Sequence, residues 1–187
     1  MVIQTKGIVL KVIRYSDTQE IHTLFTEQMG LISLITRVKK RGNLPPLYEG
    51  EFTLRKGKNF FQLIDARQTA HHHLIRERLL SIETAFQLIH ILLKSQMPLK
   101  PAPALYALFS AFLKQIPSLE NLPALKAVFI AKLLLHEGHL DPDNELLSQL
   151  AVLKSFKDIE SFPLPKEGEK EIDHRFDEAY DFVFEKN

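Results

Sequence analysis

The chain has 187 residues and not one cysteine. This absence excludes a disulfide framework, a thiolate metal site and a cysteine nucleophile. No apolar run reaches the eighteen or so residues that a membrane span needs, because Lys and Arg interrupt every candidate. Charges are scattered through the apolar positions of the N-terminal segment, which is not the pattern of a secretory signal. We therefore expect a cytoplasmic protein with no membrane contact.

Signatures of catalysis and of metal binding are also missing. The sequence has no GxxxxGK[ST], GxGxxG or GxSxG motif, and residues 141–145 (DPDNE) lack the glycine and distal glutamate of a calcium loop. The histidines at 71–73 are consecutive and cannot all face one ion, so a polar junction between domains explains them better. His136 and His139 are three apart across a glycine, whereas a zinc helix needs four, so capping of a helix C-terminus is expected there. We expect no metal, no cofactor and no enzymatic activity.

Charge and proline divide the chain into two parts. Residues 1–80 contain 13 Lys and Arg against 7 Asp and Glu, a net charge of +6, whereas residues 81–187 contain 11 against 16, a net charge of −5. Only two of the ten prolines precede residue 81. Such asymmetry indicates two modules, of which the basic one faces a polyanion. We place the domains at 1–73 and 74–187.

The first part is predicted to be a small barrel. β-branched residues mixed with single polar ones predict five short antiparallel strands, over 2–15, 21–26, 31–38, 48–55 and 59–67. Gly7 is expected to bend the first strand, and Gly30 to supply the positive φ of the turn before the third. Five strands in about seventy residues are too few for a two-sheet sandwich and favour the five-stranded OB-fold.

The second part is predicted to be all helical, which makes the fold class α+β. Apolar residues at steps of three and four predict helices near 105–116 and 125–135, and a first stripe through Ile75, Leu79, Ile82, Phe86, Ile89 and Leu93. A shorter helix is expected at 144–155, capped by Asp143 or Asn144. A linker near 156–170 then leads to a terminal amphipathic helix through Ile172, Phe176, Tyr180 and Phe184. That helix either docks on the bundle or binds a partner.

Basic residues on the predicted strands and hairpin tips, interleaved with aromatics, carry the strongest functional signal. Single-stranded nucleic acid requires this combination, because cations track the phosphates and exposed rings stack on the bases. Phe60 and Phe61 are adjacent on a predicted strand, so at most one is exposed. The alternative is that these cations only form a solvent-exposed surface of the barrel and bind no ligand, with the rings packed inward. The candidate nucleic-acid-binding residues are Lys6, Lys11, Arg14, Tyr15, Arg37, Lys39, Lys40, Arg41, Arg55, Lys56, Lys58 and Phe60.

Several short segments resemble the bacterial DNA repair protein RecO family in order and spacing. They are residues 5–10 (TKGIVL), 15–17 (YSD), 24–27 (LFTE), 30–32 (GLI), the basic run 37–41 before Pro45 and Pro46, and 133–142 (LLLHEGHLDP). His139 stands where the family usually has tyrosine. Many members also carry a four-cysteine zinc module after this point, which a chain without cysteine lacks. The similarity spans roughly residues 3–142 and identifies the chain as a short member of this family.

The resemblance implies an N-terminal OB-fold, a C-terminal helical domain and a role as a recombination mediator. Such a protein binds single-stranded DNA, anneals complementary strands and, with RecR, helps to load recombinase on strands coated by single-strand-binding protein. The family binds the acidic, Phe-ended tail of that protein on the helical domain. Lys126 and Lys132, on the third predicted helix, are the candidate residues for that tail; the alternative is that each lysine only covers the edge of the core. The implied location is the bacterial cytoplasm, at the nucleoid.

Two other functions fit the residues. One is an OB-fold RNA-binding module, because stacking and phosphate tracking do not distinguish RNA from DNA without contacts to the 2′-hydroxyl. The other is a protein–protein adaptor, in which the basic face meets an acidic protein. Competition between DNA and RNA of the same sequence separates the first alternative, and weak binding independent of strand length indicates the second.

Overall fold

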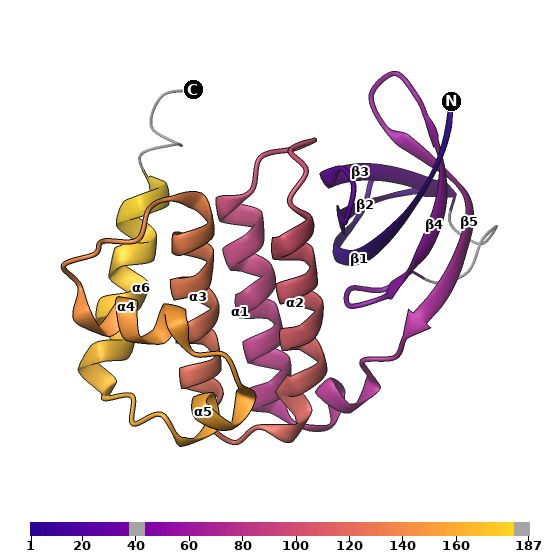
Figure 1. The fold of residues 1–187 in the computed structure, drawn as a ribbon. Coiled ribbons are helices and arrows are strands. Elements are labelled where there is room, and N and C mark those ends of the chain that lie inside the picture. The colour runs from indigo at the N-terminus through magenta and orange to yellow at the C-terminus, as the bar shows by residue number, and fades with distance from the viewer. Residues whose placement is uncertain (38–43, 182–187) are drawn as a thin grey trace. The chain divides into compact units, whose positions relative to one another are not determined.

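The computed structural model describes residues 1–37 and 44–181, with strands first and helices after them (Figure 1). The strands are β1 (Val2–Arg14), β2 (Gln19–Thr26), β3 (Gly30–Arg37), β4 (Glu49–Lys56) and β5 (Phe61–Ala70). The helices are α1 (Leu79–Ser95), α2 (Pro103–Gln115), α3 (Leu122–Glu137), α4 (Glu145–Val152), α5 (Phe156–Ser161) and α6 (Lys166–Asp181), with short 3₁₀ helices η1 (His73–Glu77) and η2 (Ile116–Ser118). The predicted α+β order is confirmed.

The five strands close into a barrel in the order β1-β2-β3-β5-β4. All neighbours are antiparallel except β3 and β5, which pair in parallel through Leu34 with Phe61 and Ile35 with Gln62. Consecutive hairpins give the antiparallel pairs, whereas the parallel pair requires the chain to cross over between β3 and the β4–β5 hairpin. A closed five-stranded barrel is the architecture of the OB-fold, and the prediction of this fold is confirmed.

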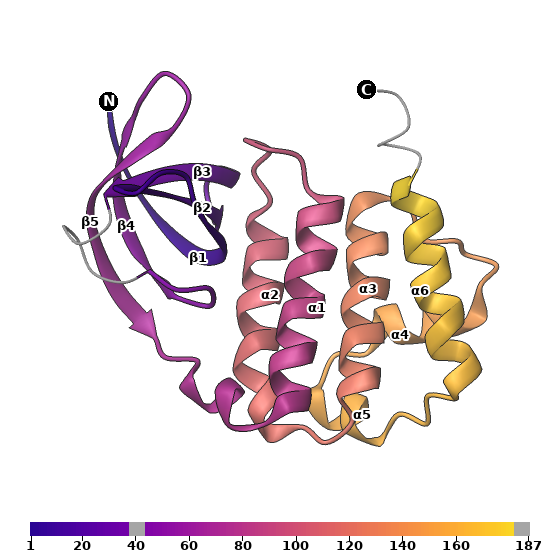
Figure 2. The same ribbon diagram turned by 180° about the vertical axis from the view of Figure 1, so that it is seen from behind.

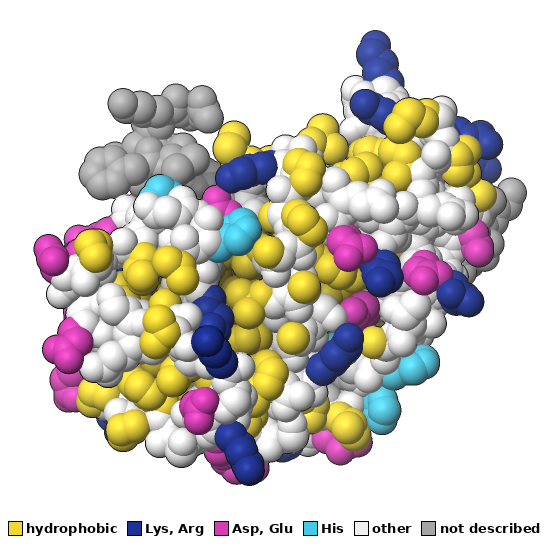
Figure 3. All heavy atoms as spheres, viewed as in Figure 1, with side chains coloured by type: hydrophobic (Ala, Val, Ile, Leu, Met, Phe, Trp, Pro, Cys, Tyr) yellow, Lys and Arg dark blue, Asp and Glu magenta, His cyan; other side chains and the backbone are white. Residues whose placement is uncertain are grey.

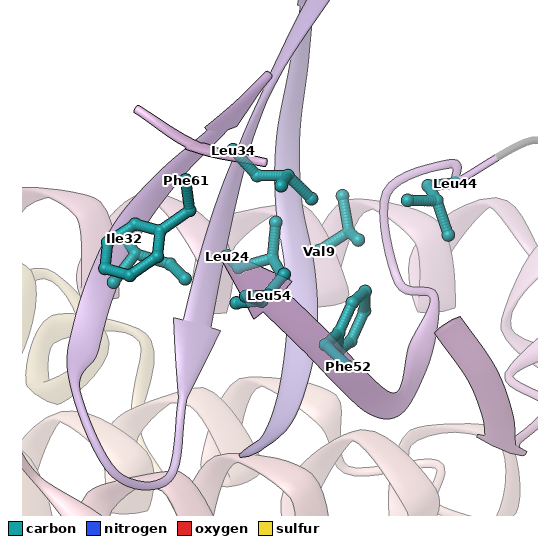
Figure 4. Packing of buried hydrophobic residues seen from close by; sticks show 8 residues of the cluster. All are labelled: Val9, Leu24, Ile32, Leu34, Leu44, Phe52, Leu54 and Phe61. Carbon is teal, nitrogen blue, oxygen red and sulfur yellow. The ribbon is translucent and has the colours of Figure 1, made fainter. Parts of the chain in front are cut away.

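Apolar side chains at alternate positions of the strands fill the inside of the barrel. On β3, for example, Ile32 and Leu34 are buried while Ser33 between them is exposed. Burial of each such apolar side chain contributes about 1.5–3 kcal/mol. Figure 4 shows the cluster, which consists of Val9, Leu24, Ile32, Leu34, Leu44, Phe52, Leu54 and Phe61.

The two glycines with predicted roles have different ones in the structure. Gly30 has φ +67° in the turn between β2 and β3, as expected. The irregularity of β1, however, is a shift in register between Val9 and Lys11 and not a bend at Gly7. A Cβ at Gly7 would lie 3.3 Å from the ring of Phe52, so the close approach of that ring explains this glycine.

One polar side chain, His22 on β2, lies inside the barrel. Its exposed fraction is 2%, and its Nε2 lies 2.9 Å from Thr36 Oγ1 and 3.6 Å from a carboxylate oxygen of Glu20. Burial lowers the pKa of His22, and the Glu20 charge and the backbone of Leu44 only partly oppose this effect. The folded protein therefore holds this imidazole in its neutral form at pH values where the unfolded chain binds a proton.

We expect the barrel to lose stability below pH 6.5 because of this histidine. The unfolded state protonates there first, so the free energy of unfolding falls as pH decreases, by up to about 1.4 kcal/mol per pH unit for one proton. Above pH 6.5 the residue is neutral in both states and has no effect. Urea unfolding of wild type and His22→Gln across this range measures the difference. Parallel curves for the two proteins would contradict the prediction.

Helix α3 is the centre of the helical part, with α1, α4, α5 and α6 in contact with it. All of its residues from 124 to 131 are buried, so it is buried on every side rather than along one stripe. The predicted stripe through α1 is only partly buried: Ile75 and Ile89 are buried, whereas Leu79 and Phe86 are 70% and 46% exposed. The buried face of α1 instead consists of Ser81, Thr84, Ala85, Leu88, Ile89, Ile91 and Leu92. This face is therefore displaced from the predicted stripe, in part because small and polar residues fill the first turns of the contact.

The segment predicted as a linker, 156–170, contains α5 and the first residues of α6. The backbone N–H of Asp158 donates to the side chain of Ser155, which caps α5, and Ile159 is buried. Asn144, rather than Asp143, caps α4 by accepting from the N–H of Leu147. The terminal amphipathic helix is confirmed over its described length, with Ile172, Phe176 and Tyr180 buried; Phe184 lies outside the described residues.

The chain divides into two compact units, a barrel unit of Met1–His73 with Gln96–Ser110 and a helical unit of Leu74–Ser95 with Ala111–Asn187. The predicted division after residue 73 placed Gln96–Ser110 with the helices. They cluster instead with the barrel, because the ring of Phe25 packs 6.0 Å from that of Tyr106 and 6.4 Å from that of Phe109. No helix within the described ranges is long and apolar enough to cross a membrane.

Candidate nucleic-acid interface

The turn between β1 and β2 presents an aromatic ring and a cation to solvent. Tyr15 is 61% exposed, and its N–H donates to the carbonyl of Gln19, which closes the turn (2.9 Å). Arg14 lies 3.8 Å from the carboxylate of Asp17, and both side chains are well exposed. Such a surface pair is worth little, so it does not prevent Arg14 from binding a phosphate. In an OB-fold this turn is one of the two loops that flank the oligonucleotide-binding face.

The register of the sheet places Arg37 beside this turn. Gln19, which begins β2, pairs with Arg37 at the end of β3. On the other side of β2, Thr23 pairs with Lys11 of β1. Arg37 and Lys11 are exposed. Thr36, the neighbour of Arg37, faces His22 inside the barrel, so alternation directs Arg37 outward. Arg14, Tyr15 and Arg37 thus belong to one end of the β1–β2–β3 sheet, and Lys11 lies farther along it, opposite the middle of β2.

The turn between β4 and β5 presents a second basic group. Arg55, Lys56 and Lys58 are all exposed, and Figure 3 shows Lys and Arg side chains projecting from this turn at the upper right. The N–H of Gly57 donates to the carbonyl of Phe60 (3.1 Å). Phe60 therefore lies in the turn, whereas the sequence predicted it on a strand. Its ring is half-buried. Phe61 begins β5 and points into the core with 8% exposure.

Parallel pairing connects the second turn with the face of β3. Phe61 pairs with Leu34, so the residues just before Phe61 lie near the middle of β3. The β2–β3 face and the loops β1–β2 and β4–β5 form the usual oligonucleotide surface of an OB-fold. The structure places Tyr15, Arg37, Lys58 and Phe60 at these positions.

Lys6 lies in different surroundings from the other candidates. It pairs with Glu51 across β1 and β4 and lines a recess of about 490 Å³ together with Glu27, Asp65 and Arg67. Arg67 donates to Glu51 at 2.6 Å. Three carboxylates surround Lys6, so this surface attracts phosphate less than the two turns do. Lys39, Lys40 and Arg41 follow Arg37 in the sequence and lie outside the described residues.

The two lysines proposed for partner binding have different environments on α3. Lys126 is 7% exposed, and its Nζ lies 2.9 Å from Asp173 and 3.0 Å from Glu169, both on α6. Burial alone lowers the pKa of Lys126, but the hydrogen bonds that its ammonium group donates to these two carboxylates, together with their charges, outweigh burial and raise the pKa. Lys132 donates to the carbonyl of Ala151 at 2.9 Å, and burial lowers its pKa. Both lysines already have partners within the chain.

Sequence reasoning missed a buried polar cluster in the barrel unit. Glu49 on β4 accepts a hydrogen bond from the hydroxyl of Ser110 on α2 (2.6 Å), and its other oxygen lies 2.8 Å from Nε2 of His72. All three are less than 10% exposed. Burial, and after it the charges of Glu49 and Glu27, raise the pKa of Tyr106 beside this cluster.

The histidine run gave the only sequence signal of this cluster. His71 and His73 are exposed, whereas His72 is buried. His136 and His139 were predicted to cap a helix C-terminus. His136 lies in the last turn of α3, 3.1 Å from its neighbour Glu137. The backbone N–H of His139 donates to the carbonyl of Leu134 at this helix end (2.8 Å), while its ring packs edge-on against that of Tyr180. The cap of α3 is Gly138, at φ +78°. No group of three or more potential ligands that could hold a metal occurs in the part of the chain that the structure describes.

Comparisons with known proteins agree with this architecture. Residues 1–71 match the family described as "Recombination protein O N terminal". The DNA repair protein RecO of Chlamydia pneumoniae is 31% identical over 148 residues, which cover 75% of this chain and 58% of the relative. RecO of Bacillus pumilus is 28% identical over 122 residues, or 62% of this chain and 48% of the relative. RecO of Chlamydia trachomatis serovar L2 is 40% identical over 60 residues, or 25% of its length.

These matches differ in extent. The chain spans about half the length of the two relatives with the longest matches, 58% and 48%. A match over 75% of this chain cannot fit within residues 1–71, so similarity continues past the barrel. Residues 1–71 therefore belong to the RecO N-terminal family, and the chain as a whole is similar to the DNA repair protein RecO.

Proposed function

We propose that this chain binds single-stranded DNA through its barrel and acts in DNA repair and recombination. The observation that carries the proposal is the position of cations and rings at the two turns that flank the binding face of an OB-fold: exposed Arg14 and Tyr15 at the first turn, and exposed Lys58 with half-buried Phe60 at the second. Similarity to RecO proteins supports the repair role. The place of action under this proposal is the bacterial cytoplasm, where the chromosome lies.

The mechanism is neutralisation of charge and requires no bond chemistry. Cations around the turns bind the phosphates of one strand and release its counterions. Tyr15 offers a face on which a base stacks. Because the bases are not read by specific hydrogen bonds, their pairing edges stay available for a second strand, and repulsion between the two phosphate backbones is reduced. Annealing of complementary strands follows from these properties.

The finer assignments concern protein partners. If the chain acts as RecO proteins are expected to, it works with RecR and with the acidic tail of single-strand-binding protein to help load recombinase. The helical unit offers the surface for that tail, since Lys126 and Lys132 are its candidate anchors. Because both lysines already bind groups of their own chain, access for a partner requires these contacts to change.

The decisive experiment is a titration of fluorescent single-stranded DNA at several salt concentrations. Six described cations at the two turns and the sheet predict a log–log slope of about −4, since each neutralised phosphate contributes about −0.7. Single-stranded DNA should bind more tightly than duplex DNA or RNA of the same sequence. Weak binding that hardly depends on salt would reject the proposal in favour of a protein adaptor, and a preference for RNA would favour the RNA-binding module.

A further inference from the structure

The outer face of the β1–β2–β3 sheet carries a row of three isoleucines, called the isoleucine row below. Strand pairing places Ile13 opposite Ile21, and Ile21 opposite Ile35, on three strands that lie side by side (Figure 2). Their neighbours His22 and Leu34 are buried inside the barrel, so alternation directs the isoleucines outward. Ile13 is 45% exposed, and the other two are partly exposed.

The same face continues toward the other end of the strands, where α2 packs on it. Ile8, Phe25 and Leu31 form a paired row there, and all three are buried. The ring of Phe25 packs against the rings of Tyr106 and Phe109, which explains why outward positions are apolar at that end. The isoleucine row remains partly exposed instead, although an antiparallel sheet normally turns polar side chains to water.

Polar and basic side chains border the isoleucine row. None of the bordering positions carries a carboxylate. A contiguous apolar group with a polar rim is typical of a binding surface, and cations on both sides of the row favour a polyanion. A single nucleic-acid strand satisfies both features, because it combines phosphates with flat apolar bases. The bordering residues are Lys11, Thr23 and Ser33 on one side, Tyr15, Gln19 and Arg37 on the other, and Gln62 beside Ile35 on β5.

We propose that the isoleucine row contacts the bases of the bound strand and favours thymine through its C5-methyl group. Aliphatic side chains offer neither hydrogen bonds nor a π-face, so they select for apolar surface alone. Thymine presents that surface, since it is the base of DNA that carries a methyl group. The proposal deepens the proposed function, because it rests on binding of single-stranded DNA by the barrel and names thymine-rich strands as the preferred substrate.

Contact with the methyl group is compatible with strand annealing. The C5-methyl group lies on the major-groove edge of the base and not on the edge that forms Watson–Crick pairs. A strand held in this way keeps its pairing edges available for a second strand. The same contact disfavours RNA, in which uracil lacks the methyl group, and it does so without any contact to the 2′-hydroxyl.

The length of the row sets the expected size of the preference. Neighbouring strands are about 4.8 Å apart, so three isoleucines span about 10 Å. Bases of one strand are about 3.4 Å apart when fully stacked and farther apart when extended, which leaves room for about two methyl groups. Burial of one such group changes affinity by a factor of about three to four. We therefore expect a preference of about tenfold.

The first test compares two fluorescent oligonucleotides of equal length, one of thymidine and one of deoxyuridine. They differ only in the methyl group, so the salt dependence of binding should be the same while the thymidine strand binds about tenfold more tightly. A second pair, 5-methyldeoxycytidine against deoxycytidine, carries the methyl group at the same ring position and should show a gain in the same direction. Equal affinity within each pair would overturn the proposal.

The second test removes the isoleucine row. Threonine keeps the β-branched shape that suits a strand, so Ile13→Thr, Ile21→Thr and Ile35→Thr together should reduce the thymine preference to about twofold or less without changing the salt slope. Ile13→Thr alone, at the most exposed position, should reduce it about threefold and provides the test if the triple variant does not fold. Val152→Thr, at a residue of α4 that is 66% exposed, is the control. A triple variant that folds and keeps the full preference would contradict this assignment.

The same titrations distinguish failure of this proposal from failure of the DNA function. Salt-dependent binding with equal affinity for thymidine and deoxyuridine strands would reject the isoleucine contact and leave the DNA function in place. No binding of any oligonucleotide would reject the DNA function and, with it, this proposal, and would favour an acidic protein as the occupant of this face.

Discussion

Replacing Arg37, Lys56 and Lys58 together by alanine is expected to weaken binding of single-stranded DNA about a hundredfold at 0.1 M salt. Each lost phosphate contact removes about 0.7 from the slope of log affinity against log salt, which at this salt concentration equals about 0.7 in log affinity. Three contacts give about two decades, and the slope should decrease by about two. All three side chains are exposed, so the folded structure should survive the change.

The matched control removes the same charge from the other unit. Lys154, Lys157 and Lys170 are exposed lysines of the helical unit, and their joint replacement by alanine should leave both affinity and slope nearly unchanged. Lys6→Ala should have an effect much smaller than one of the turn residues, because carboxylates surround Lys6. If the variant without Arg37, Lys56 and Lys58 binds single-stranded DNA as tightly as the control variant of the helical unit, DNA is not held at these turns.

Tyr15→Ala separates stacking from charge. Loss of one stacked base costs about 1–3 kcal/mol, which is roughly a factor of five to a hundred in affinity. Because tyrosine carries no charge, the salt slope should stay as in wild type while affinity falls at every salt concentration. A changed slope would mean that the substitution disturbs the neighbouring cations rather than a stacking platform.

Removal of the buried carboxylate of Glu49 is expected to be the most damaging single substitution for the barrel unit. Glu49→Ala leaves His72 and Ser110 buried without the group that now pairs them. Loss of one partner from a buried pair typically costs about 3–5 kcal/mol, a large share of the stability of a small domain. Urea unfolding, followed by circular dichroism and by tyrosine fluorescence, measures this loss.

Glu51→Ala is the matched control for that experiment. Glu51 lies two positions along the same strand, is exposed, and contacts Arg67 at the surface, so its loss should cost at most about 1 kcal/mol. Glu49→Gln should lie between the two, since an amide still accepts a hydrogen bond from Ser110. A double-mutant cycle with His72→Ala isolates the pair. Similar losses for Glu49→Ala and Glu51→Ala would refute a structural role for the cluster.

Local sequence determined most of the secondary structure of this protein. Alternating residues predicted the five strands, Gly30 predicted the turn before β3, and Asn144 was one of the two residues predicted to cap α4. Strand alternation, positive φ and capping involve residues only a few positions apart, so a single sequence contains the information they require. The position of Arg14 and Tyr15 beside the turn between β1 and β2 was also predictable, because the turn is signalled by the residues that directly follow them.

Only the tertiary structure decided which side chains meet across the chain. Glu49 and Ser110 are 61 positions apart, and Lys126 and Asp173 are 47 apart, and no periodicity connects such pairs. Leu79 and Phe86 of α1 are exposed although they fit the apolar stripe, because Ser81, Thr84 and Ala85 occupy the contact in those turns. Of the two lysines proposed for a partner, Lys126 was found on carboxylates of α6, since Coulomb attraction acts between whatever charges the fold brings together, and Lys132 on the backbone carbonyl of Ala151. Composition and spacing thus set the elements, whereas packing set their faces and their charge partners.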